Sequence, residues 1–366
     1  MMDPEFRLDL FTYTGEKFAE ISDFLELAAT TVVNTPGVLK AVLPGNHAAL
    51  ANLQNNSQVE LFYKYSGGVW TRFFGGIYRA QDQKQPNEPY FTLTAKGYLW
   101  LLSTRIVAYA ANVANKSYFS AVKAETIMKT LVTYNLTASA TTANGRVRNG
   151  TNWPATLISV ALDAAGGTTQ DWYCAQEVVL DSLEKLAKIA GGDFDLVKTA
   201  ANTFEFRFYA GQVGTNRTSS ITFSLGHGNM GNPNYSYDRT REATVGIVGG
   251  QGEDSSREFA VRTGVDYSSA NDIEIFVPAT DVAAGNTAGL NTAGDSVLEE
   301  KRSKEVFSFD VIQTKNSRFG ADYFLGDLVT AINPYTKASV TQKVVSASLS
   351  ILKSGEGNFS VEMATP

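Results

Sequence analysis

Two histidines and one cysteine are the scarcest reactive residues of this sequence. His47 and His227 lie far apart, and neither has a second His, Cys or carboxylate at the spacing of metal ligands. Cys174 has no cysteine partner, which excludes an internal disulfide and fits synthesis in a reducing compartment. No Gly-x-Ser-x-Gly nucleophile elbow occurs. The sequence therefore predicts no metal site, no cofactor and no Cys-His or serine nucleophile.

One glycine pattern matches that of dinucleotide-binding loops, at Gly226, Gly228 and Gly231. It follows an expected strand at 220–225, as such a loop does. A pyrophosphate site also requires a helix that begins at the third glycine. Asn-Pro-Asn-Tyr follows instead at 232–235, without helical periodicity. The pattern therefore indicates a turn-rich loop rather than a nucleotide site.

Paired carboxylates and tryptophans are the residues that glycoside chemistry would need. Asp193 with Asp195, and Glu253 with Asp254, are candidate pairs, but chance also produces such pairs in a chain with 37 acidic residues. The tryptophans could stack on sugars or fill cores; they are Trp70, Trp100, Trp153 and Trp172. A cell-wall hydrolase or glycan-binding protein is thus an alternative. It requires a cleft with two carboxylates at glycosidase separation beside an exposed tryptophan.

The composition is that of a globular, strand-rich protein. The 366 residues are 43% hydrophobic and 19% charged, enough for two or three domains with cores of their own. Phe and Tyr are abundant, with 21 and 16 residues, and Pro is scarce, which favours strands joined by tight turns. A net charge of −6 argues against nucleic-acid binding. We expect no signal peptide and no membrane span.

The clearest strand signal lies near the C-terminus. In the strand expected at 342–352, Val345, Ala347, Leu349 and Ile351 alternate with serines and would share a buried face. A glycine turn at 354–358 then returns the chain antiparallel, as the alternation through Phe359 indicates. These strands would close a β-barrel.

We expect the whole chain to divide into three parts. Residues 5–107 have the strand pattern of a first barrel, with an apolar run at 98–105 that is helix or strand. Residues 108–242 form an inserted α+β domain, with helices expected at 122–134 and 171–190 and a hairpin that turns at 200–202. Residues 243–366 form a second barrel, with strands at 243–248 and 273–277 and an extended loop at 278–296. The end of that loop, around Leu290 and Ala293, has helical spacing.

A series of short motifs resembles one protein family. The motifs occur in order at 187–196, 203–208, 249–257, 272–279, 294–298 and 324–329. Together they resemble siphophage tail proteins of the ReqiPepy type, which look like tail (baseplate) hub proteins. The resemblance spans roughly residues 175–366. The family-motif residues that we expect to be structural are Gly252, Glu253, Arg257, Glu274, Gly294, Gly326 and Asp327.

The resemblance implies a structural virion protein rather than an enzyme. It implies a hub fold similar to the hub region of VgrG spike proteins, with two tail-tube-like β-barrels separated by an inserted domain. Three chains would then present six barrels, so that a threefold tail tip can meet a sixfold tube. The implied partners are two further copies, the tail tube or distal tail protein, the tape-measure protein and tail-tip or fibre proteins. The implied place is the virion tail tip, assembled in the bacterial host cytoplasm, with a part in host attachment and genome delivery.

Overall fold

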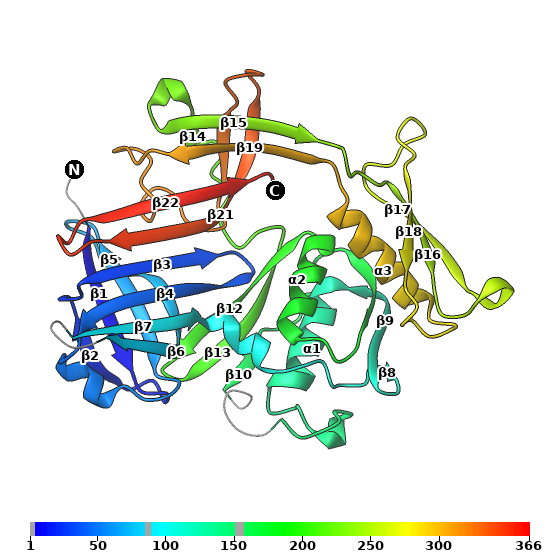
Figure 1. Cartoon of the computed structure of the whole chain (residues 1–366), viewed down its shortest axis with the longest axis horizontal. Coiled ribbons are helices and arrows are strands. Elements are labelled where there is room, and N and C mark those ends of the chain that lie inside the picture. Colours follow the sequence, from blue (N-terminus) through cyan, green and yellow to red (C-terminus); the bar gives the residue numbers. More distant parts are fainter. Residues whose placement is uncertain (1–3, 85–88, 151–156) are drawn as a thin grey trace.

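The computed structural model describes residues 4–84, 89–150 and 157–366, and the fold is mainly β, as predicted. Figure 1 shows the strands of both chain ends together at one side. Helices α1 and α2 lie in the middle, and a small sheet with helix α3 lies at the far side. Among the described residues, no helix is long and apolar enough to cross a membrane.

The largest sheet takes strands from both ends of the chain. Its order is β14-β20-β21-β3-β4-β7-β6-β5-β1-β2, and β22 pairs with β21. The N-terminal strands are β1 (Glu5–Phe11), β2 (Lys17–Ile21), β3 (Glu26–Val32), β4 (Thr35–Pro44), β5 (Gln58–Lys64), β6 (Thr71–Lys84) and β7 (Tyr90–Gly97). The C-terminal strands are β14 (Thr222–Phe223), β20 (Leu328–Ile332), β21 (Ser339–Ile351) and β22 (Gly357–Ala364). This path of described strands does not close on itself, so barrel closure stays a prediction.

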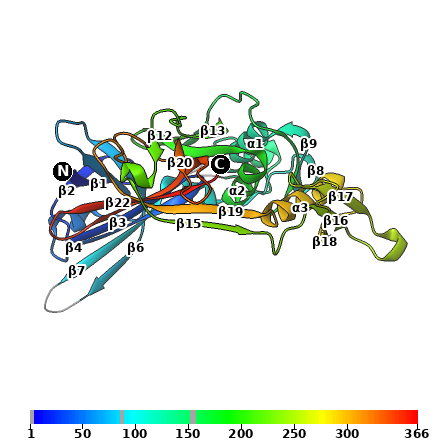
Figure 2. The same ribbon diagram turned by 90° about the horizontal axis from the view of Figure 1, so that it is seen from above.

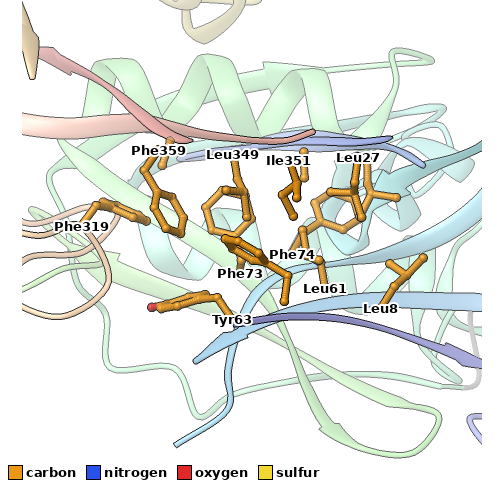
Figure 3. Packing of buried hydrophobic residues seen from close by; sticks show 14 of the residues in the cluster. Leu8, Leu27, Leu61, Tyr63, Phe73, Phe74, Phe319, Leu349, Ile351 and Phe359 are labelled. Carbon is orange, nitrogen blue, oxygen red and sulfur yellow. The ribbon is translucent and has the colours of Figure 1, made fainter. Parts of the chain in front are cut away.

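One hydrophobic core joins the two chain ends. Figure 3 shows Leu27, Leu349 and Ile351 pointing toward Leu8 and Leu61 across the space between two layers of strands. Phe359 of β22 lies at the centre of a group of aromatic rings that come from both ends of the chain. Its ring centroid is 5.6 Å from those of Tyr63, Phe73 and Phe319. The last strands of the chain therefore bury the first ones.

Strand β21 differs from its expected face pattern in one place. The antiparallel pairing with β22 shifts by one residue between Val344 and Ser346, which is a β-bulge. The bulge turns Val344 into the core and leaves Val345 half-buried, so the prediction that Val345 shares the buried face was wrong. Beyond the bulge, Ala347, Leu349 and Ile351 are buried as predicted. On the serine face, the Ser348 hydroxyl lies 2.9 Å from that of Thr30 on β3.

The middle of the chain forms an α+β region with a second core. The apolar run at 98–105 is a 3-10 helix, η2 (Tyr98–Thr104), and it packs into this core. The other elements of this region are β8 (Asn112–Val113), β9 (Lys116–Lys123), α1 (Ala124–Leu136), η3 (Thr142–Asn144), β10 (Ile158–Val160), β11 (Thr169–Cys174), α2 (Val179–Ala190), β12 (Gly192–Ala200) and β13 (Thr203–Ala210). A further 3-10 helix, η1 (Ala48–Asn52), lies between β4 and β5 and packs against the first core.

Helix α2 begins later than expected, because the residues before it form a strand. Trp172 and Cys174 alternate into the core from β11, which pairs antiparallel with β9. The helical spacing begins only at Val179, and Gly191 ends the helix in a left-handed conformation. The predicted hairpin that turns at 200–202 is confirmed as β12 and β13.

A two-stranded ribbon carries a small unit at its end. The ribbon consists of β15 (Met230–Asp238) and β19 (Lys304–Val311). Residues 243–303, most of the chain between these two strands, are called the α3 unit here. It contains β16 (Val245–Gly249), η5 (Asp254–Ser256), β17 (Phe259–Thr263), β18 (Glu274–Pro278) and α3 (Thr287–Glu300). Its ends meet where the Ala243 N–H donates to the Lys301 carbonyl at 3.1 Å.

The α3 unit contains a helix where a loop was expected, and it has a hydrophobic core of its own. The extended loop expected at 278–296 is wrong in its second half, because α3 begins at Thr287 and uses the helical spacing of Leu290 and Ala293. The unit also has its own core, around Val248, Val277 and Leu290. The division into 5–107, 108–242 and 243–366 stays a prediction.

Candidate functional site

The glycine-rich loop does not form a nucleotide site. Residues Leu225–His227 form the 3-10 helix η4, and Gly228 then has a positive φ of 68°. Strand β15 starts at Met230, so Gly231 lies in a strand and opens no helix. The dinucleotide motif lacks the helix N-terminus that would bind phosphate.

The reactive residues singled out from the sequence lie apart from one another. The His47 ring contacts Asp23, with Nε2 3.2 Å from Oδ1, whereas the His227 ring lies beside the Thr222 carbonyl. Cys174 is buried, and burial raises the pKa of its thiol to about 12. Within residues 4–84, 89–150 and 157–366, no group of three His, Cys, Asp or Glu side chains could hold a metal ion.

The two aspartates of β12, Asp193 and Asp195, both face the large sheet. Asp193 forms hydrogen bonds with neighbouring elements, whereas Asp195 lines a pocket. Asp193 accepts hydrogen bonds from Asn34 Nδ2 at 3.1 Å, from Lys343 Nζ at 2.7 Å and from the Val213 N–H at 2.8 Å. Its carboxylate therefore fixes the inserted region to β21 and to the turn before β4. Asp195 lies in a pocket of about 310 Å³ and accepts from the Leu196 N–H at 2.7 Å.

The pocket at Asp195 contains one carboxylate among its lining residues. Burial raises the pKa of Asp195, although the Leu196 N–H and the charges of Arg72 and Arg207 act in the opposite direction. The other candidate pair, Glu253 and Asp254, lies at the exposed start of η5. Neither pair presents two carboxylates across a cleft, which is what glycoside hydrolysis requires.

The described tryptophans are occupied by protein contacts. Trp172 is buried and donates from Nε1 to Ser182 Oγ at 3.2 Å. The guanidinium of Arg7 lies 4.6 Å from the Trp70 ring, and that of Arg79 lies 4.3 Å from the Trp100 ring. Trp153 lies outside the described residues.

Gly326 and Asp327 hold the end of the inserted region against the large sheet. The Asp327 carboxylate is buried and accepts from the Thr215 N–H at 2.6 Å, from Arg217 Nε at 2.6 Å and from the Phe324 N–H at 2.9 Å. Gly326 has a φ of +83°, and a Cβ there would lie 2.3 Å from Val213 Cγ1. The left-handed φ and the close approach of Val213 favour glycine at 326, and the donors around residue 327 favour a carboxylate there.

The other family-motif residues lie in the α3 unit. Gly252 has a φ of +112°, and Arg257 Nε donates to its carbonyl at 3.1 Å, which shapes the turn after β16. Glu253 caps η5, and Glu274 is exposed on β18. A Cβ at Gly294 would lie 2.6 Å from Arg262 Cγ, so this glycine lets α3 approach the sheet closely. The structure thus gathers Gly252, Gly294 and their neighbours in one unit, away from Asp327.

A buried charge group that sequence reasoning missed joins β5 to the β12–β13 hairpin. Glu60 accepts from Tyr98 Oη at 2.7 Å, from Lys198 Nζ at 3.0 Å and from Arg72 Nη1 at 3.2 Å. Burial by itself would raise the pKa of Glu60, but the charges of Arg72 and Lys198 and the hydrogen bonds from Tyr98 and Lys198 lower it. Glu60 alternates with apolar residues in β5 like an ordinary surface residue, so the sequence contains no signal for this role.

The negative charge of the protein is concentrated in the α3 unit. Residues 243–303 contain ten acidic and four basic residues, a formal charge of −6 that equals the net charge of the whole chain. The same unit exposes large apolar side chains; they are Phe259, Val261, Val265, Tyr267, Ile273 and Phe276. The most distinctive surface of the molecule is therefore apolar and surrounded by carboxylates.

Comparison with known structures shows the fold of phage tail proteins. The 43 kDa tail protein of prophage MuSo2 from Shewanella oneidensis matches with a TM-score of 0.54 and 10% identity, over 98% of each chain. A tail protein from Neisseria meningitidis matches with a TM-score of 0.55 and 11% identity, over 99% of this chain and 96% of that one. A chain of the Francisella PdpA–VgrG complex matches at 0.52 and 9%, over 99% of this chain and 58% of that one. At these identities the likeness shows the fold alone.

Sequence comparison extends the resemblance to nearly the whole chain. A search of curated proteins found no match. The family model described as Siphovirus ReqiPepy6 Gp37-like protein matches residues 7–362, which includes the N-terminal strands that the motif series did not cover. The chain therefore belongs to the siphovirus tail protein family of ReqiPepy6 Gp37-like proteins.

Proposed function

We propose that this tail protein forms a trimeric hub that joins a sixfold tail tube to a threefold tail tip. The observation that supports this role best is the large sheet, to which residues 5–97 and 328–364 contribute strands around one core. Each chain contributes one group of strands from each of its two ends, so three copies would bring together six groups of strands. Ring closure would also pair the sheet edges at β2 and β14, which have no further partner among the described strands of one copy.

The partners proposed from the family are other proteins of the tail. They are the tail tube or distal tail protein, the tape-measure protein and tail-tip or fibre proteins. The site of action would be the virion tail tip, after assembly in the host cytoplasm. The chain outside the α3 unit has equal numbers of acidic and basic residues, 27 of each, which supports protein contacts rather than nucleic-acid binding.

We propose that the chain is not an enzyme. Two pockets among the described residues bear on a tail-tip hydrolase. The pocket at Asp195 has a single carboxylate among its lining residues. A pocket of about 700 Å³ between α2 and α3 is lined by Glu177, Asp281, Glu299 and Glu300, but the tryptophan beside them, Trp172, is buried rather than exposed. A dye-release assay on purified peptidoglycan tests this point, with Asp195→Asn as the matched variant. We expect no release above buffer from either protein. Release that Asp195→Asn abolishes would establish a hydrolase.

Solution mass tests the trimer. Light scattering over a range of concentrations should find a species near three times 39.6 kDa. Cryo-electron microscopy of that species should show a threefold ring with six similar lobes. A mass that stays near 39.6 kDa, together with assembled tails whose tips lack threefold symmetry, would contradict the proposal.

A further inference from the structure

The sheet of the α3 unit has one covered and one open face. Its strands lie in the order β17-β16-β18, with β16 antiparallel to β17 and parallel to β18. Helix α3 covers one face, where Val248 and Val277 pack against Leu290. Figures 1 and 2 show α3 between this sheet and the body of the molecule, so the other face points away from the molecule.

The pairing register places apolar residues side by side on the open face. One row across the three strands consists of Val261, Ile247 and Phe276. Ile247 of β16 is directly opposite Val261 of β17 on one side and Phe276 of β18 on the other. Phe259 lies in the next row, opposite Gly249. Phe259, Val261 and Phe276 are 54%, 65% and 50% exposed, whereas sheet faces with this pattern are ordinarily covered.

Gly249 makes room for one of these rings. A Cβ at Gly249 would lie 2.8 Å from Phe276 Cζ and 3.4 Å from Arg257 Cδ. The Phe276 ring therefore lies across the glycine, next to the stem of Arg257, instead of extending into solvent. A ring held in this way keeps a flat apolar surface ready for contact, at little cost in side-chain entropy.

Carboxylates surround this surface. Asp272 and Glu274 lie at the start of β18, and Glu253 and Asp254 lie at the turn between β16 and β17. All four are exposed, and none forms an ion pair with another part of the described chain. With the unit at −6, this surface attracts a basic partner and repels a second copy of itself.

We infer that the open face of the α3 unit binds an extended, basic segment of another protein, one in which apolar residues alternate with Lys or Arg. The apolar side chains would cover Val261 and Phe276, and the cations would lie near Asp272 and Glu274. Strands β17 and β18 each pair only with β16 among the described strands, so their outer edges can add a strand. This inference goes beyond the proposed hub, because it concerns the α3 unit and not the sheet edges through which the proposed ring would close.

A synthetic peptide tests the inference on the full chain. The probe is a fluorescent peptide of about eight alternating Lys and Val residues, the length of a typical strand or slightly more. Two matched peptides carry Glu in place of Lys, or Thr in place of Val. Fluorescence anisotropy should show binding of the Lys-Val probe alone, and the binding should weaken as salt is added.

Variants then locate the site. Phe259→Thr with Val261→Thr should weaken the affinity about tenfold or more, and Asp272→Asn with Glu274→Gln should do so at low salt. Leu162→Thr is the control, since Leu162 is 92% exposed in a different region and should leave binding unchanged. Circular dichroism checks that each variant is folded, and Val261→Thr alone replaces the double variant if it is not.

Three results would overturn the inference. One is a Lys-Val affinity that no variant of the open face changes. Another is equal binding of the Glu-Val peptide. The third is self-association of the wild type that Phe259→Thr with Val261→Thr abolishes, because the face would then bind a second copy. Peptide binding is measured independently of ring formation, so its failure leaves the test of the hub intact.

Discussion

Glu60 is a buried acid at the contact between β5 and the β12–β13 hairpin. Glu60→Gln would leave Lys198 and Arg72 without their anion, and the Lys198 side chain is only 10% exposed. We expect a loss of about 3–5 kcal/mol in the free energy of unfolding, measured by urea denaturation. Glu177→Gln is the control, because the Glu177–Lys185 pair is more exposed and should contribute less than about 1 kcal/mol. Equal losses would contradict a structural role for Glu60.

Asp195 should make stability depend on pH in a recognisable direction. Its pKa is raised by burial, so the folded state binds the proton more readily than the unfolded chain. Its ionised form therefore costs stability above the folded pKa, and this cost disappears as the pH falls below the ordinary value of 3.8. Asp195→Asn should stabilise the protein at pH about 7, and the gain should shrink in acid. Urea midpoints across pH measure this, and a gain that is constant with pH would disprove the assignment.

The turn before β20 and the turn between β21 and β22 each contain a glycine of the same conformation. Gly326 and Gly355 have φ values of +83° and +84°, but only Gly326 is crowded, with Val213 Cγ1 at 2.3 Å from a built Cβ. Gly355→Ala should cost about 1 kcal/mol, for the left-handed conformation alone. Gly326→Ala should cost about 2–4 kcal/mol, because Val213 and the Asp327 contacts must shift as well. Thermal unfolding of both variants measures the difference, and similar losses would show that the close approach is relaxed in solution.

The whole molecule should respond very differently to two deletions. A chain that ends after residue 338 lacks β21 and β22, which opens the edge of β3 and removes Leu349, Ile351 and Phe359 from the common core. We expect this chain to lose cooperative unfolding and to aggregate.

Replacing the α3 unit by a short Gly/Ser linker is the matched control. The unit begins and ends beside the paired ends of β15 and β19, and it has a core of its own. The remaining protein should stay soluble, with a single thermal transition by circular dichroism. A cooperative transition in the C-terminal truncation would show that the N-terminal strands fold by themselves.

Local patterns determined the fold class and many of the elements. The alternation in β21 and β22, the spacing of Leu183 and Leu186 in α2, and the hairpin at 200–202 are all readable because neighbouring residues encode them. The motif series also contains Asp327, whose carboxylate accepts hydrogen bonds from three donors. That the motif residues as a group are structural stays a prediction. The family followed from the order of these motifs.

Only the tertiary structure decided how these elements pair and which apolar faces stay open. Ser348 pairs with Thr30, more than 300 residues away in sequence, and no local period reveals such a partner. The bulge after Val344 changes the face of Val345 by inserting one residue into a ladder. Phe259 and Val261 alternate just as residues of a buried strand do. The periodicity of apolar residues in the sequence indicates which side chains share a face of a strand or helix. The packing of distant elements decides whether that face is covered or left open for a partner.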